Sequence, residues 1–181
     1  VRAAGVIVVA SAGNDASTSP FYPAAYDGVV SVAATTIEKT RAPYSNGGAT
    51  IDVAAPGGYN GTDLNGDGLA DGVVSTIGDD SGTGISYAYA ALMGTSMAAP
   101  HIAGVAALMK AIYPALSPDD FDSLLATGAI TEDLGAAGRD NVFGHGLIDA
   151  QQAVIAALDL ANANGAPTGP ILTGSPSSLN F

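Results

Sequence analysis

Residues 94–101 read Gly-Thr-Ser-Met-Ala-Ala-Pro-His and open an apolar segment that Tyr113-Pro114 ends. The pattern predicts a helix over residues 96–112, and because its apolar side chains lie almost all round, we expect this helix to be buried. Ser96 at the helix start would project its hydroxyl beside its own backbone N–H and the positive end of the helix dipole, which suits a nucleophile that forms an oxyanion. An isolated serine before a helix is more often only an N-cap, so the motif alone leaves both interpretations open.

Three short β-branched runs lie upstream of this helix, at residues 6–10, 29–34 and 51–55. They are typical of strands buried on both faces of a parallel sheet. The first run leads into Ser11-Ala12-Gly13-Asn14, a loop at the carboxyl end of a strand. Functional residues of α/β folds commonly lie on such loops.

A hairpin and two more helices complete the expected elements. A Gly-, Asp- and Thr-rich stretch contains the hairpin, over residues 73–77 and 87–92. Ser117 is an N-cap followed by proline and acidic residues, which predicts a short helix. Asp149 caps a last helix over about residues 150–160.

Composition excludes several classes of protein. The 181 residues carry 17 Asp and Glu against 5 Lys and Arg, a net charge of -12, with 48% hydrophobic and 12% charged residues. Such a chain is apolar enough to fold and long enough to bury a core. The negative charge repels phosphate, and no apolar run reaches the roughly 18 residues of a membrane span, so we expect no nucleic-acid partner and no membrane. The absence of cysteine excludes disulfides, thiolate zinc sites and a cysteine nucleophile.

Taken together, segments 11–14 and 94–101 resemble the subtilisin-like serine peptidases, whose nucleophile motif is similar to GTSMAAPH and whose oxyanion-hole asparagine lies in a motif similar to VVASAGN. Further matches follow in family order at residues 22–24, 29–34, 44–46, 52–57 and 144–150. The resemblance covers about residues 1–160. It implies an α/β, three-layer subtilisin-like fold with a mainly parallel sheet, of which only the C-terminal half is expected here.

The resemblance also implies a mechanism and a substrate class. Ser96 Oγ would attack the scissile carbonyl of a protein or peptide, and the side-chain amide of Asn14 with the Ser96 N–H would hold the oxyanion. The backbone of Ser11, Ala12 and Gly13 would line one wall of the substrate pocket. Phe21 would be a bulky residue near the floor of this pocket. The family further implies a secreted, extracellular enzyme.

The sequence departs from the family at the general base. The family's base is a histidine in a His-Gly-Thr-His-like motif, oriented by an aspartate in an Asp-Thr/Ser-Gly-like motif, and neither motif occurs here. His101 is five residues past Ser96 and so rotated to another helix face, and His145 is in a Gly-rich loop. We therefore expect the chain to be inactive alone, with an N-terminal half as its missing partner. The alternative is a catalytically silent subtilisin-like domain that acts as a calcium-stabilised binding or structural module.

A second informative segment contains a calcium-loop pattern. Side chains with oxygen ligands stand at positions 1, 3, 5 and 9 of an EF-hand-type loop, and Gly68 stands at position 6, where the loop turns sharply. A backbone carbonyl is available at position 7. The expected ligands are therefore Asp63, Asn65, Asp67, Leu69 and Asp71. Position 12 is Val74 rather than glutamate, so Asp79 or Asp80 would have to replace it by chain reversal. The alternative is a solvated acidic turn. A calcium-dependent adhesion module would require paired loops, and one is present.

The resemblance alone implies a second, weaker cation site. Its ligands would be three backbone carbonyls and one carboxylate, from Ala24, Tyr26, Val29 and Asp52. The expected organisation is thus the C-terminal portion of a peptidase domain over residues 1–161, with a calcium-loop insertion at 63–80. Residues 162–181, rich in Gly, Pro, Ser and Asn, are expected to be a linker or the start of a further module.

Overall fold

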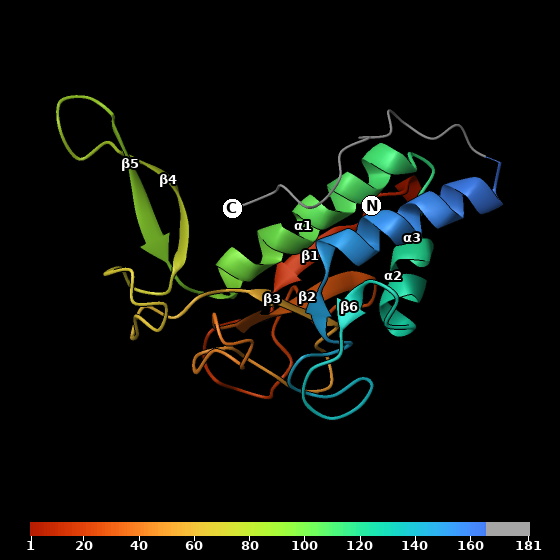
Figure 1. The fold of residues 1–181 in the computed structure, drawn as a ribbon, viewed down its shortest axis with the longest axis horizontal. Coiled ribbons are helices and arrows are strands. Elements are labelled where there is room, and N and C mark those ends of the chain that lie inside the picture. The colour runs from red at the N-terminus through yellow and green to blue at the C-terminus, as the bar shows by residue number, and fades with distance from the viewer. Residues whose placement is uncertain (166–181) are drawn as a thin grey trace.

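The computed structural model describes residues 1–165, so the predicted linker at 162–181 lies almost entirely outside the described residues (Figure 1). A short 3-10 helix, η1 (Arg2–Ala4), precedes a five-stranded sheet. The sheet has the order β1 (Val8–Ser11), β2 (Val29–Thr35), β3 (Val53–Pro56), β7 (Leu147–Ile148) and β6 (Thr131–Glu132). The first four strands are parallel and β6 runs antiparallel to β7, which confirms the predicted α/β fold with a mainly parallel sheet.

Three helices lie on one face of the sheet: α1 (Thr95–Ile112), α2 (Pro118–Ala126) and α3 (Ala150–Ala163). Helix α1 packs on β1, β2 and β3, α3 packs on α1, and α2 contributes Phe121 and Leu125 to the same core. The alternation of strand side chains divides the core in two. Val30, Val32 and Ala34 of β2 face the helices, whereas Ala33 lies on the opposite face. There it packs with side chains from loops. Helices therefore cover one face of the sheet in the described part of the chain.

Helix α1 is buried on one side only, so the prediction that it is buried all round is wrong. Ile102 and Met109 are fully buried, but Leu108 is 50% exposed, and Ala103 and Ala107 are exposed beside it. The sheet and α3 cover the buried side. No described segment covers the other side, although its residues are apolar.

Helix α3 extends beyond its predicted end. Residues 162 and 163 form its last turn, and the side-chain amide of Asn164 donates to the carbonyl of Leu160 at 2.8 Å where the helix stops. The predicted domain boundary after residue 161 therefore lies inside a helix. The backbone and side-chain N–H groups of Asn164 both donate to the Leu160 carbonyl, one of the last carbonyls of the helix, which lack partners within it.

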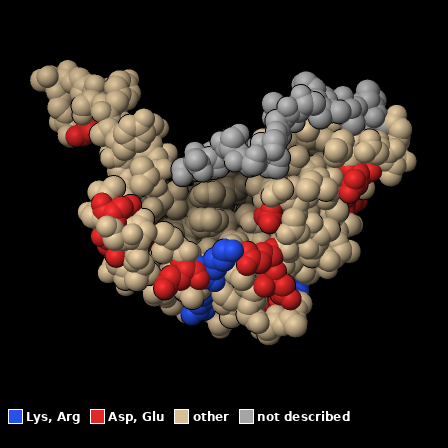
Figure 2. Space-filling model, in the orientation of Figure 1, with Lys and Arg blue, Asp and Glu red and all other residues tan. Residues whose placement is uncertain are grey.

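The predicted hairpin forms from β4 (Val73–Asp79) and β5 (Ser86–Leu92) and projects from the body (Figures 1 and 2). Its side chains are mostly exposed, including Tyr87 at 82% and Tyr89 at 77%. On the face drawn in Figure 2, basic side chains are mostly gathered in one small area that acidic side chains border. None of the described helices combines the length and hydropathy needed to span a bilayer.

Candidate active site

The loop after β1 meets the start of α1 through Asn14 and Thr95. The backbone N–H and the hydroxyl of Thr95 both donate to Asn14 Oδ1, each at 2.9 Å. The N–H of Gly13 donates in turn to the Thr95 hydroxyl at 3.2 Å. Because Oδ1 accepts both bonds, the amide nitrogen of Asn14 remains available as a donor. This nitrogen lies beside the helix start, since a Cβ atom placed on Gly94 would stand 3.5 Å from it.

Ser96 is the second residue of α1, and its side chain is exposed. The N–H groups of Met97 and Ala98 donate to the carbonyl of Gly94 at 2.9 and 3.3 Å. Within residues 1–165, the N–H of Ser96 has no hydrogen-bond acceptor, as is usual in the first turn of a helix. Among the described residues, the amide nitrogen of Asn14 and the N–H of Ser96 are thus two unsatisfied donors at one helix end, where the helix dipole favours negative charge.

The turn before Ser96 is fixed by a close backbone approach. The N–H of Gly94 donates to the carbonyl of Gly57 and to the Tyr44 hydroxyl, both at 2.9 Å. A Cβ atom at Gly57 would lie 2.9 Å from the Gly94 carbonyl oxygen, so a side chain at residue 57 would force the turn away. Gly94 itself has φ 148°, in the region that favours glycine. Burial raises the pKa of Tyr44, which favours the protonated hydroxyl that donates to the Gly57 carbonyl.

Asn46 holds the loop that contains Asn14. This buried side chain accepts the N–H groups of Asp15 and Ser17, at 2.9 and 3.0 Å, and donates to the Ala12 carbonyl at 2.9 Å. Sequence reasoning found Asn14 but missed the positioning residues Thr95 and Asn46. Thr95 lies inside the nucleophile motif and Asn46 inside a matched segment, but neither pattern indicates which atoms are held.

The expected substrate-binding residues lie together beside this loop. Ser11 ends β1, Ala12 and Gly13 are buried, and Phe21 lies against Gly13, with its Cγ 3.1 Å from where a Cβ of residue 13 would stand. The Phe21 side chain is 42% exposed, so part of its ring faces solvent. Asn46 engages the carbonyl of Ala12 with its side chain and that of Gly13 with its N–H. The substrate-binding role of these residues stays a prediction.

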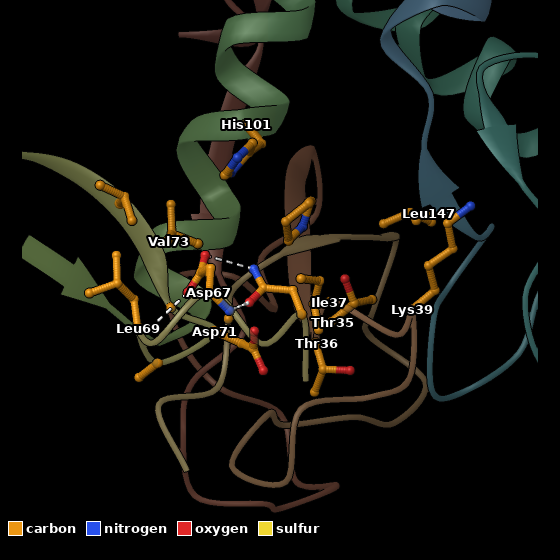
Figure 3. Close-up of a pocket in the computed structure, with 16 residues that line it drawn as sticks. Thr35, Thr36, Ile37, Lys39, Asp67, Leu69, Asp71, Val73, His101 and Leu147 are labelled. Carbon is orange, nitrogen blue, oxygen red and sulfur yellow. Dashed lines mark hydrogen bonds between the residues drawn. The ribbon is translucent and has the colours of Figure 1, made fainter. Parts of the chain in front are cut away.

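Neither histidine reaches Ser96 in the described structure. A ring nitrogen of His101 bonds the Met97 carbonyl at 2.8 Å, and the ring borders a cavity of about 460 Å³ (Figure 3). His145 precedes β7. No hydrogen bond joins the Ser96 hydroxyl to any residue among 1–165. The described residues therefore place an exposed serine hydroxyl and two unsatisfied donors at one helix end, with neither histidine hydrogen-bonded to Ser96.

The chain is similar to known proteins over most of its length. Residues 1–146 match the model of the subtilase family. The chain belongs to the subtilase family. It is 40% identical over 157 residues to an extracellular protease of Xanthomonas campestris pv. campestris, covering 86% of this chain and 24% of that protein. It is 37% identical over 155 residues to subtilisin DY of Bacillus licheniformis, covering 83% of this chain and 47% of that protein.

A solved structure is similar as well. A protease from Pseudoalteromonas arctica PAMC 21717 matches with a TM-score of 0.74 and 42% identity, over 86% of this chain and 44% of that chain. This subtilase chain therefore spans between about a quarter and a half of the length of these relatives.

The calcium-loop pattern of this subtilase forms a compact exposed loop. Asp63 Oδ1 accepts the N–H groups of Gly66 and Asp67, and its Oδ2 accepts that of Gly68. Asp67 accepts the N–H of Leu69 at 2.8 Å and the side-chain amide of Asn65 at 2.9 Å (Figure 3).

The expectation that Asp79 or Asp80 replaces the ligand at position 12 is wrong. Asp79 pairs with Ser86 at the far end of β4, and the loop joins β4 at its opposite end. Six residues of extended chain put the Asp79 carboxylate about 20 Å from the loop. Asp80 lies one residue farther along the chain. The hairpin projects away from the loop, so the chain does not reverse onto it.

The expected second cation site is partly described by a cavity and a turn. Val29 and Asp52 line a cavity of about 240 Å³ with Asp122 and His145, and the N–H of Val29 donates to the Tyr26 carbonyl at 3.1 Å. The carboxylate of Asp52 accepts the N–H of Ser31 at 2.8 Å. Burial raises the pKa of Asp52, with the Ser31 N–H opposing the rise. A cation role for these residues stays a prediction.

Proposed function

We propose that this chain is the nucleophile-bearing part of a secreted serine endopeptidase that cleaves proteins or peptides by acyl transfer through Ser96. The observation that carries the proposal is the helix end. There an exposed serine hydroxyl lies beside its own unbonded N–H and beside an asparagine whose oxygen is anchored by Thr95 and whose nitrogen is left to donate. The family and the extracellular relatives support the reaction class and the location.

In this mechanism the Ser96 hydroxyl adds to the scissile carbonyl while its proton passes to a base. The oxyanion that forms is held by the N–H of Ser96 and the side-chain amide of Asn14. Collapse of this tetrahedral intermediate expels the amine, which takes the proton from the base, and water then hydrolyses the acyl-enzyme. Donors of this kind contribute most when they are fixed before the reaction, and the bonds from Thr95 and Asn46 fix Asn14 in that way.

We infer that the base and its orienting acid come from an upstream half of the same domain. Three open surfaces support this inference. Strand β1 is at the edge of the sheet, α1 exposes the apolar residues Ala103, Ala107 and Leu108, and a groove of about 550 Å³ separates the hairpin from α1. Exposed apolar side chains that are contiguous on a surface often mark an interface.

The proposal is tested by covalent labelling. A fluorophosphonate reagent, which reacts with activated serines, should modify Ser96 in a protein assembled with the upstream half, as located by peptide mass spectrometry. Ser96→Ala should abolish the labelling, and Ser123→Ala, at an exposed serine of α2, should leave it unchanged. An assembled protein that folds but is not labelled would instead support a catalytically silent domain.

A further inference from the structure

We propose that the loop of residues 63–71, with Asp71 as its buried anchor, binds one calcium ion. Oxygen atoms of Asp63, Asn65 and Asp67 recur at alternate positions of this loop, as in hard-cation sites. Spacing alone does not make a site, because the same residues also stabilise solvated turns. The independent observation is the state of Asp71.

Asp71 is only 7% exposed, and its two carboxylate oxygens differ. Oδ2 accepts the N–H of Leu64 at 2.7 Å and the hydroxyl of Thr62 at 3.1 Å, so the carboxylate faces the start of the loop. Oδ1 is buried and has no hydrogen-bond partner among residues 1–165. A buried carboxylate oxygen without a partner costs free energy, and a cation supplies the missing interaction.

The exposed members of the loop retain capacity for an ion. A carboxylate offers about four lone-pair sites, and Asp63 uses three of them on loop N–H groups while Asp67 uses two. Nowhere in residues 1–165 do three Asp, Glu or His side chains already group closely enough to hold a metal. We therefore expect binding to draw Asp63 and Asp67 toward Asp71. Calcium fits this set best because it accepts six to eight oxygen ligands in flexible geometry, including carbonyls and water.

The position of Asp71 gives the ion a structural role. The carbonyl of Asp71 accepts the N–H of Tyr59 at 2.9 Å, and its N–H donates to the carbonyl of Thr62 at 2.9 Å. Tyr59 follows the Gly57–Gly58 turn, and Gly57 binds the N–H of Gly94 before the nucleophile helix. The ion would thus stabilise the base of the β4–β5 hairpin and the strand end that supports this turn.

The test uses binding and unfolding, so its outcome is independent of peptidase activity. Calcium chloride is titrated calorimetrically into the 181-residue chain after treatment with EGTA, and melting curves are recorded with calcium and with EGTA. We expect one calcium per chain. At a calcium concentration about 100 times the Kd, the melting temperature should rise by roughly 5–10 °C.

Asp71→Asn is the decisive variant. It should lose the calcium-dependent rise, yet in EGTA it should melt no lower than the parent, because its amide oxygen can still accept the Leu64 N–H while the buried, unpartnered carboxylate oxygen is removed. Asp67→Asn changes an exposed ligand and does not endanger folding; it should weaken binding roughly tenfold or more. Asp80→Asn is the matched control outside the loop and should bind as the parent does. The proposal is overturned if the melting temperature of the parent does not depend on calcium, or if a folded Asp71→Asn keeps the full calcium-dependent rise. If Asp71→Asn does not fold, calcium binding by Asp67→Asn that equals that of the parent overturns it.

Discussion

At Asn14 the two ends of one carboxamide have different roles. Its oxygen accepts both donors of Thr95, and its nitrogen, which has no acceptor among residues 1–165, is the group that we propose binds the developing oxyanion. A side chain held in this way loses no further conformational freedom when the substrate reacts, which is the basis of electrostatic preorganisation. The same residue thus connects the β1 loop to the helix that contains Ser96.

In the assembled enzyme, Asn14→Ala should lower kcat by about 10²–10³, the range known for the corresponding asparagine of subtilisin, with KM nearly unchanged. Asn14→Asp keeps an oxygen for Thr95 but lacks the donor, and we expect a comparable loss. Steady-state kinetics on a peptide substrate measure both variants. Full activity of Asn14→Asp would mean that Asn14 serves only to anchor Thr95.

A pH effect on stability arises at His145. Burial lowers the pKa of His145, Arg139 lowers it further and Asp52 partly opposes them. With the folded-state pKa below its ordinary 6.5, the unfolded chain takes up the proton first as the pH falls. The free energy of unfolding therefore decreases as the pH drops through about 6.5 toward the folded-state value.

Urea unfolding at about pH 7.5 and about pH 5.5, on either side of the ordinary histidine pKa, measures this effect. His145→Asn cannot titrate and should show a smaller decrease between the two pH values than the parent. Equal decreases in the two proteins would contradict the assignment to His145.

At the scale of elements, the predictable features were those with local causes. Ser117 and Asp149 cap α2 and α3 as their sequence context predicts. Strands β6 and β7 have two residues each and leave no period in the sequence, so they were not anticipated. The direction of the hairpin was not predictable either, because it depends on packing outside the hairpin.

The capping box of α2 gives a prediction at this scale. Ser117 Oγ accepts the N–H of Asp120 at 3.1 Å, and the Asp120 carboxylate accepts the N–H of Ser117 at 2.8 Å. Ser117→Ala should lower the free energy of unfolding by about 1 kcal/mol, within a usual range of roughly 0.5–2. Chemical denaturation checks this value, and Ser123→Ala in the same helix, which removes no cap, should cost clearly less.

At the scale of the whole molecule, the sequence pattern of α1 and the burial of α1 differ. The sequence of α1 is apolar almost all round, yet residues 1–165 cover one side of it. The resemblance to the family was sufficient to expect Asn14 near the start of α1, where its side chain bonds Thr95, the neighbour of Ser96. It was not sufficient to predict the open side of α1 or the exposed hairpin, since these depend on which surfaces the rest of the domain would cover.

We propose that Ser96 is a competent nucleophile only when an upstream half supplies its base. The most direct measurement is hydrolysis of a chromogenic peptide by the 181-residue chain alone and by the same chain assembled with that half, each with a Ser96→Ala counterpart. We predict no measurable hydrolysis by the chain alone and hydrolysis by the assembly that Ser96→Ala abolishes. Robust hydrolysis by the chain alone, or activity that survives Ser96→Ala in the assembly, would contradict the claim.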